Sequence, residues 1–246
     1  MRLLLIDNSN SRTKLCLSIG ETIVEESIRR LPTADLTAQQ LKDFSRDFQP
    51  DACIVCSVVP EKARLIEEAI NTPFHSLDFR SPLGIGIDYP KPEKIGADRL
   101  ANAAACATHY GSPAIVVDFG TAVTFDVLDR KKGYVGGVIA PGLAAMNDYL
   151  ARKTALLPTI DPHEPDRAIG RSTEEAMHAG AVFGYRGLVR EILTKIEEEL
   201  PSKPRIIATG GDASLIARDI DRIEAVDRHL TLEGLRLVGT RVFQKN

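Results

Sequence analysis

The chain has 246 residues, of which 43% are hydrophobic and 26% charged, a composition that suits a folded protein with a sizeable core. Its formal net charge is −3 and no run of lysine and arginine occurs, so nucleic acid is not expected as a partner. The apolar part of MRLLLID (1–7) is too short for a signal peptide, and no window reaches the length of a membrane span. We therefore expect a cytoplasmic protein with no membrane contact.

The first half of the chain alternates between predicted strands and helices. Short apolar runs between turn residues indicate strands, whereas helical apolar stripes, first-turn proline and alanine-rich runs indicate helices. In this half we predict strands at 2–6, 13–18, 22–28, 52–59 and 74–77, and helices at 36–48, 60–70 and 98–110. A loop rich in glycine and proline (81–96) precedes the last helix.

The second half has the same order of elements. Here we predict strands at 114–119, 122–129, 134–140 and 205–209, helices at 141–152 and 172–200, and finally two short helices with a strand between them. The long helix contains Gly184 and Gly187, near which we expect a break.

Residues 3–17 and 114–128 resemble each other at a constant offset of 111 positions. The matched positions are Asp7 and Asp118, Ser9 and Gly120, Asn10 and Thr121, and Thr13 and Thr124. In both copies an apolar strand ends in Asp and is followed by a turn of small residues. We interpret this as a duplication that gives two α/β halves, 1–112 and 113–246, around a cleft. Since ligands bind beyond the carboxyl ends of strands, both turns should face that cleft.

The two turns suit a bound polyphosphate. Small residues expose backbone N–H groups to an anion, a strand-end Asp can hold Mg²⁺, and Lys14 adds positive charge. Phosphoryl transfer requires mainly such positioning and charge neutralisation. Neither G-x-x-x-x-G-K-[ST] nor G-x-G-x-x-G occurs, so neither a P-loop nor a Rossmann site is indicated.

Two further positions have alternative interpretations. Asp98, at the predicted start of a helix, is either a first-turn acid favoured by the helix dipole or a base for a substrate hydroxyl beside Arg99. Gly210-Gly211 is either a plain turn or a surface for a flat ring such as adenine.

Cys53 and Cys56 form a C-x-x-C inside a buried-strand pattern, which favours a structural role. The five histidines lack metal-ligand spacing.

Over essentially its whole length the sequence resembles the type III pantothenate kinases, members of the acetate/sugar kinase–Hsc70–actin superfamily. The matching segments are IDNSNSRTK (6–14), DYPKPEKIGADRLANA (88–103), VVDFGTAVTFDVLD (116–129), GYVGGVIAPGL (133–143), IGRSTEEAMHAG (169–180), IIATGGDA (206–213) and LTLEGL (230–235). The resemblance implies a duplicated ribonuclease H-like (actin-like ATPase) fold and ATP-dependent phosphorylation of pantothenate, the first step of coenzyme A synthesis.

The resemblance also implies roles for single residues. The ATP phosphate loop would comprise Asp7, Asn8, Ser9, Asn10, Ser11, Arg12, Thr13 and Lys14, with Thr121 as a further ATP contact. Asp7 would lie near Mg²⁺ and Asp118 at a monovalent cation, K⁺ or NH₄⁺. The pantothenate contacts would be Tyr89, Gly96, Ala97, Asp98, Arg99 and Thr173, with Asp98 as proton acceptor. The family implies a cytosolic homodimer.

One position departs from the family pattern, because Ser9 occupies a place that usually holds glycine. A positive φ there would strain serine, whereas a negative φ would leave its hydroxyl available to donate. Two alternatives to the pantothenate kinase follow: a non-catalytic relative acting as a regulatory accessory factor, and a kinase of another small hydroxy acid. The presence of both Asp7 and Asp98 favours an enzyme.

Overall fold

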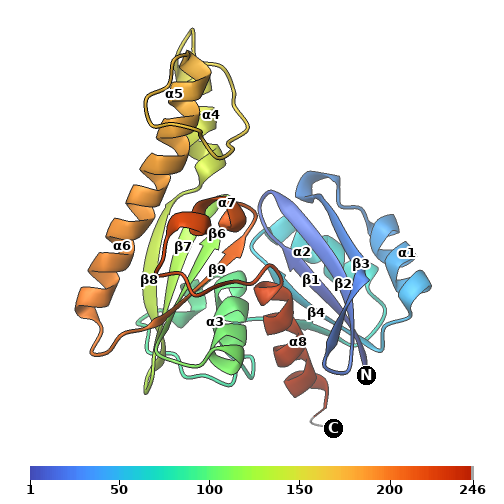
Figure 1. The fold of residues 1–246 in the computed structure, drawn as a ribbon. Helices are drawn as coiled ribbons and strands as arrows, with labels where there is room; N and C mark the ends of the chain where they lie inside the picture. Colours follow the sequence, from blue (N-terminus) through green and yellow to red (C-terminus); the bar gives the residue numbers. More distant parts are fainter. Residues whose placement is uncertain (245–246) are drawn as a thin grey trace. The chain divides into compact units, whose positions relative to one another are not determined.

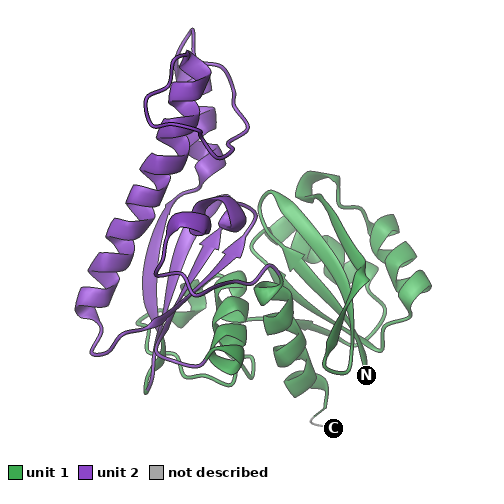
Figure 2. Cartoon of the chain, viewed as in Figure 1, with its two compact units in different colours: residues 1–110, 131–134, 229–246 green, residues 111–130, 135–228 purple. Residues whose placement is uncertain are grey.

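The computed structural model describes residues 1–244 and divides into two compact units (Figure 2). Unit 1 contains residues 1–110, 131–134 and the chain from 229 onward, and unit 2 contains 111–130 and 135–228. The units therefore differ from the predicted halves, 1–112 and 113–246, because 131–134 and the helix after 229 belong to unit 1.

Among the described residues, each unit holds a five-stranded sheet, with strand order β3-β2-β1-β4-β5 in unit 1 and β8-β7-β6-β9-β10 in unit 2 (Figure 1). The central strands, β1 and β6, each pair antiparallel with the next strand along the chain and parallel with the fourth of their own sheet. Because the same strand order occurs twice, the prediction of two similar α/β halves is confirmed.

Unit 1 alternates strands and helices much as predicted. Its elements are β1 (Arg2–Asn8), β2 (Arg12–Ile19), β3 (Thr22–Pro32), α1 (Ala38–Phe48), β4 (Ala52–Ser57), α2 (Pro60–Ala69), β5 (Phe74–Ser76), α3 (Ala97–His109) and α8 (Leu230–Phe243). Helix α1 begins with a capping box between Thr37 and Gln40 and ends at Gln49, whose left-handed backbone turns the chain. With 14 residues, α8 is longer than the short final helix we predicted.

The two faces of the unit 1 sheet pack against different helices. Buried side chains of β1, β4, α1 and α2 form one core, including Leu4, Ile6, Cys53, Val55, Leu41, Phe44 and Ile66. The opposite face packs against α8, where a Cβ on Gly239 would lie 3.0 Å from Ile54 and 3.1 Å from Leu3. Because side chains alternate along a strand, Asp7 lies on this second face of the sheet.

Helices α3 and α8 approach each other closely within unit 1. A Cβ on Gly234 would lie 2.0 Å from the carbonyl oxygen of Ala101, so only glycine fits there. A buried hydrogen bond of 2.8 Å from the Thr231 hydroxyl to the Asn102 Oδ1 fixes the same pair of helices. The alanine-rich sequence of α3 permits this packing and holds the helix that begins with Asp98.

Unit 2 repeats the sheet and adds a longer helical region. Its elements are β6 (Ala114–Phe119), β7 (Ala122–Asp129), β8 (Gly133–Pro141, starting in unit 1), α4 (Leu143–Lys153), α5 (Thr173–Ala179), a π-helical segment (Gly180–Gly184), α6 (Tyr185–Glu199), β9 (Arg205–Gly210), α7 (Ala213–Ile216) and β10 (Ala225–Val226). The backbone stays helical from Thr173 to Glu199, but the α-helix is interrupted at Gly180–Gly184, where it is π-helical, so the interruption expected near Gly184 is present as a π-helical segment. Buried packing of Val182 and Tyr185 stabilises the helix across these glycines. Figure 1 shows α4 and α5 extending beyond the unit 2 sheet.

Candidate active site

The turn after β1 holds a buried carboxylate surrounded by donors. Asp7 is 4% exposed, and its Oδ2 lies 3.1 Å from the Lys14 Nζ, opposite it on β2. The other oxygen, Oδ1, accepts a 2.9 Å hydrogen bond from the Ser9 hydroxyl and a 3.8 Å contact from the Cys56 thiol. These donors fix the orientation of a carboxylate at the carboxyl end of a central strand, where ligands of α/β sheets bind.

A network of buried hydrogen bonds holds the same turn in place. Asn8 donates to the Thr13 hydroxyl over 2.7 Å, and this hydroxyl lies 3.0 Å from that of Thr33. Thr33 in turn donates to the carbonyl oxygen of Ser9 over 2.6 Å, while Ser57 donates to the Asn8 Oδ1 over 2.6 Å. The side chains of Asn8 and Thr13, which we expected to contact ATP, are thus engaged in holding the loop.

The remaining loop residues have accessible side chains. Asn10, Ser11 and Arg12 are exposed at the tip of the turn.

The sequence analysis missed Thr33 of the buried network, because this residue follows β3 and no local pattern relates it to the loop.

Ser9 adopts a backbone conformation that any L-residue tolerates. In the described part of the chain, Gln49 is the one residue other than glycine with positive φ. The matching Gly120 also lacks a positive φ, and a Cβ there would make an ordinary contact, 3.5 Å from the Ala122 oxygen. Neither position therefore requires glycine for its backbone, and Ser9 introduces no backbone strain.

The second turn is one residue shorter than the first. The Ser9 amide bonds to the Arg12 carbonyl, whereas the Gly120 amide bonds to that of Ala122, both at 3.1 Å. Beyond the turn, Asp7 is paired with Lys14 but Asp118 with Thr124. The match of Thr13 with Thr124 is therefore wrong: by strand register, Thr124 occupies the place of Lys14. Identical sequence spacing concealed this difference.

Two glycines closely surround the second turn. Gly210 has a φ of +97°, and a Cβ there would lie 2.6 Å from the Asp118 Oδ1 and 2.5 Å from the Phe119 oxygen. A Cβ on Gly142 would lie 2.4 Å from the Thr121 oxygen. The carboxylate of Asp118 and several carbonyl oxygens thus gather here, and oxygen is the ligand that hard cations prefer. Within residues 1–244, no group of three or more His, Cys, Asp or Glu side chains could hold a metal ion.

Asp98 lies in the first turn of α3, where both alternative interpretations have support. Its Oδ1 accepts a 2.8 Å hydrogen bond from the Arg99 amide, as a first-turn acid would. Burial raises the pKa of Asp98 above its ordinary value and the Asp7 charge raises it further, against the opposing effect of that hydrogen bond. A Cβ on Gly96 would lie 2.5 Å from the same oxygen, so glycine leaves room for this carboxylate. Unit 1 thus brings Asp7, Cys56 and Asp98 together.

An aromatic pair adjoins Arg99 in unit 1. The Arg99 guanidinium lies 5.8 Å from the ring centroid of Tyr134, and the rings of Tyr134 and Tyr89 make an edge contact at 6.1 Å. Tyr134 is buried and is bonded through its backbone to Gly86, whereas Tyr89 is partly exposed. Sequence reasoning missed Tyr134, because no local pattern in GYVGGVIAPGL (133–143) relates this side chain to Arg99.

The other predicted contacts lie in unit 2. Thr121 is exposed at the tip of the second turn. Thr173 is the exposed first residue of α5, after Ser172, whose hydroxyl caps the helix by accepting from the Glu175 amide over 3.1 Å. Within unit 2, α5 lies beyond the sheet, away from the turn after β6 (Figure 1).

Two observations bear on the cysteines and on membranes. Cys16, Cys53, Cys56 and Cys106 are all free and buried, in agreement with the structural role expected for the C-x-x-C. No helix among residues 1–244 has the length and apolarity needed to cross a bilayer.

The repeated sheet defines the class of fold, which is the duplicated α/β fold of the actin-like ATPases. The ROK hexokinase of Thermus thermophilus shares this fold over the whole of both chains, with a TM-score of 0.50 and 13% identity. A dehydratase activator from Clostridium difficile, solved with bound ADPNP, shares it with a TM-score of 0.56, 10% identity, and coverage of 100% of this chain and 98% of that chain.

The sequence comparisons define the family within this class. Residues 3–195 match the family model described as type III pantothenate kinase. A type III pantothenate kinase of Akkermansia muciniphila is 56% identical over 97% of this chain and 98% of that protein, and one of Methylacidiphilum infernorum is 45% identical over 96% and 88%. The chain belongs to the type III pantothenate kinase family and is an enzyme, as predicted.

Proposed function

We propose that this enzyme transfers the γ-phosphoryl group of ATP to the primary hydroxyl of pantothenate, with Asp98 as the proton acceptor. The observation that carries the proposal is the Asp98 carboxylate in the first turn of α3, whose pKa is raised by burial and by the charge of Asp7. A base with an elevated pKa binds the departing proton more firmly than an ordinary aspartate does. The products are 4′-phosphopantothenate and ADP, within coenzyme A biosynthesis, and we propose that the enzyme acts in the cytoplasm.

On the nucleotide side, the first turn would hold the phosphates. The exposed residues Asn10, Ser11 and Arg12 at the tip of the turn would contact phosphate oxygens through their side chains. Asp7 is the residue that would hold Mg²⁺, which when bound offsets the charge of the phosphates. Lys14, paired with Asp7, adds a second positive charge there.

A monovalent cation would be held at the second turn. Asp118 and the carbonyl oxygens near Gly210 and Gly142 supply the oxygen ligands, and Thr121 would contact ATP at the same turn. The cation would contribute positive charge at the second turn.

Pantothenate would be bound by residues around Asp98. Gly96, Ala97 and Arg99 adjoin Asp98 along the chain, and Arg99 would pair with an anionic group of a substrate. Tyr89 contacts Tyr134, the ring next to Arg99, and would be a further pantothenate contact. Thr173 would supply a further contact from α5.

We also propose that the enzyme is a homodimer that buries the α4–α5 region. Large apolar side chains are exposed there, with Leu156 at 89% and Ile169 at 83%, joined by Tyr149 and Met146 of α4. Large exposed apolar side chains concentrated in one part of the chain favour an interaction surface, and a second copy would cover them. Tyr149→Glu should convert the dimer to monomers in sedimentation equilibrium, whereas Ile19→Glu, at an exposed apolar residue of unit 1, should leave the mass unchanged.

A coupled ADP-release assay tests the activity, with ATP, Mg²⁺, K⁺ and pantothenate each omitted in turn. Turnover that requires all four supports the proposal and the cation site at Asp118. Turnover without added K⁺ or NH₄⁺ would contradict the proposed cation site. Turnover with another hydroxy acid but not with pantothenate would show that pantothenate is not the substrate. The absence of turnover in a folded protein would favour the non-catalytic alternative.

A further inference from the structure

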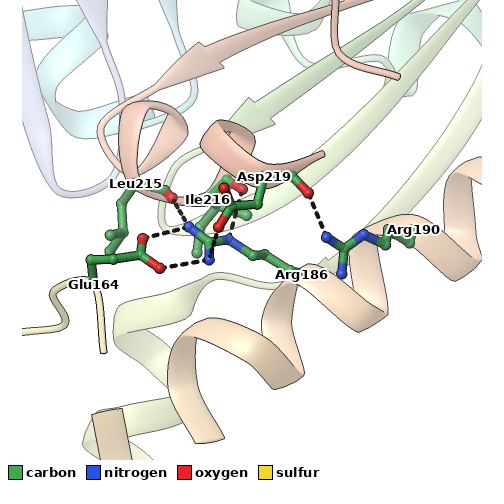
Figure 3. A network of polar contacts seen from close by, with 6 residues as sticks. All are labelled: Glu164, Arg186, Arg190, Leu215, Ile216 and Asp219. Carbon is green, nitrogen blue, oxygen red and sulfur yellow. Dashed lines mark hydrogen bonds and ion pairs between the residues drawn. The ribbon is translucent and has the colours of Figure 1, made fainter. Parts of the chain in front are cut away.

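A fully buried arginine in α6 joins three segments of unit 2 (Figure 3). The Arg186 side chain is 1% exposed, and its guanidinium binds both oxygens of Glu164, at 2.9 and 2.7 Å. It also lies 2.7 Å from the Asp219 carboxylate and donates to the carbonyl oxygens of Leu215, at 2.7 Å, and Ile216, at 3.2 Å.

These partners belong to segments that are far apart in the sequence. Glu164 lies in the connection between α4 and α5, whereas Leu215 and Ile216 are the last residues of α7. Asp219 follows in a short 3-10 helix, and its carbonyl accepts a further hydrogen bond from Arg190, one turn along α6. A buried guanidinium that lost these acceptors would be costly, so the three segments are held in one arrangement.

One side of the network leads to the second turn. Helix α7 begins at Ala213, directly after the Gly210-Gly211 turn, and the Asp212 amide bonds to the Phe119 carbonyl over 3.3 Å. Phe119 follows Asp118 and ends β6. With only four residues in α7, its position depends on what holds its carboxyl end, and Arg186 caps the carbonyl groups there.

The other side of the network leads to α5. Glu164 lies eight positions before Ser172, which caps α5 and precedes Thr173. A long connection without regular structure needs tertiary contacts to hold a single conformation. The two-oxygen contact with Arg186 provides one in the middle of the connection.

We propose that Arg186 is a positioning residue of this kinase, which sets the Gly210-Gly211 turn through α7 and the start of α5 through Glu164. The proposal rests on the proposed function, in which the turn serves the nucleotide and Thr173 serves pantothenate. It predicts that loss of the Asp219 contact changes KM for ATP and that loss of the Glu164 contact changes KM for pantothenate.

Steady-state kinetics of single variants test this separation. Asp219→Asn should raise KM for ATP, and Glu164→Gln should raise KM for pantothenate, each about fivefold to tenfold, the effect of one weakened charge-assisted contact. In each variant the other KM should stay within about twofold, and Arg186→Met should raise both. Lys195→Met is the control: Lys195 pairs with Glu198 of α6 at 2.9 Å, outside the network, and its loss should change neither KM.

A purely structural role would lower the thermal midpoint of unfolding of Glu164→Gln and Asp219→Asn and leave both KM values unchanged. That result, or equal changes in both KM values, would overturn the proposal. These two variants keep the test valid if Arg186→Met fails to fold.

Hydrogen–deuterium exchange of the protein without ligands gives a second test, independent of kinase activity. In Arg186→Lys, exchange should increase in residues 158–172 and 210–219 and remain unchanged in β6 and β7. Unchanged exchange in either segment would contradict the coupling. If the wild-type enzyme lacked activity toward pantothenate, the proposed function would fail, while the exchange result would still decide whether Arg186 holds both segments.

Discussion

At the scale of single residues, the ionised carboxylate of Asp98, the proposed proton acceptor, has a cost in stability. Its raised pKa means that the folded protein binds the proton more tightly than the unfolded chain does, so at pH values above this pKa the ionised carboxylate lowers stability. Asp98→Asn should lower kcat by about 10²–10⁴-fold, as expected for a lost general base. Because the substitution also removes the destabilising charge, it should not lower the thermal midpoint.

The pH profile checks the same assignment. In the wild-type enzyme, kcat/KM should fall with decreasing pH through the raised pKa of Asp98, and this acid limb should be absent from the residual activity of Asp98→Asn. Asp47→Asn, on the exposed surface of α1, is the control and should retain full activity. Full activity in Asp98→Asn would rule out its role as proton acceptor.

The second prediction for a single residue concerns the substitution Ser9→Gly. Because its φ is not positive and its hydroxyl donates to Asp7, changing it to glycine relieves no strain and removes a hydrogen bond. Ser9→Gly should leave kcat within about twofold or lower it, and should reduce stability by about 0.5–1 kcal/mol through backbone freedom. Parallel kinetic and calorimetric measurements decide this, and a tenfold gain in kcat/KM for ATP would show that serine hinders the loop.

At the scale of elements, the contact between α3 and α8 determines where Asp98 lies. Gly234→Ala would bring a methyl group to 2.0 Å from the Ala101 oxygen, so the helices must separate. Overpacking of this kind costs about 1–3 kcal/mol, and the shift of α3 should also reduce kcat. Gly187→Ala is the matched control, because nothing lies within 4 Å of its Cβ position in α6.

The Gly187 control should stabilise the protein by about 0.5–1 kcal/mol, the difference in helix propensity between glycine and alanine. Denaturant unfolding measures both variants. A wild-type midpoint and wild-type kcat for Gly234→Ala would show that α3 and α8 do not determine the site.

The contact between α6 and the connection before α5 should depend on pH. Hydrogen bonding to Arg186 holds the pKa of Glu164 below its ordinary value. The resulting stability is fully present above the ordinary pKa of glutamate and is lost as pH falls through the lowered value. The difference in thermal midpoint between wild type and Glu164→Gln should therefore shrink under acidic conditions, and a constant difference across this range would contradict the role of the charge.

At the scale of the whole molecule, the sequence predicted what depends on local pattern. The apolar run ending at Asp7 predicted a central strand with a functional turn, and its recurrence at Asp118 predicted the second sheet. We propose that the two sheets arose by duplication, which their common strand order supports. The same sequence spacing was misleading beyond the turn, because a one-residue difference in turn length exchanges the partners across the strand pair.

Contacts between distant segments could not be predicted. Thr33 supports the first turn from the end of β3, and Tyr134 reaches Arg99 from a segment more than 30 positions away. The placement of α8 in unit 1 depends on the absence of a side chain at Gly234, which becomes meaningful only when Ala101 lies opposite. Binary patterns give the faces of elements but not which faces meet.

The assignment of α8 to unit 1 also has a consequence for biosynthesis. Unit 2 is complete once residue 228 has left the ribosome, whereas unit 1 still lacks the helix that covers Leu3 and Ile54. Synthesis of unit 1 therefore begins before that of unit 2 but ends after it. During most of translation, the face of its sheet that α8 will cover stays exposed. Chaperones that hold nascent chains would find their binding surface on this face, which includes the strand that leads into the proposed phosphate loop.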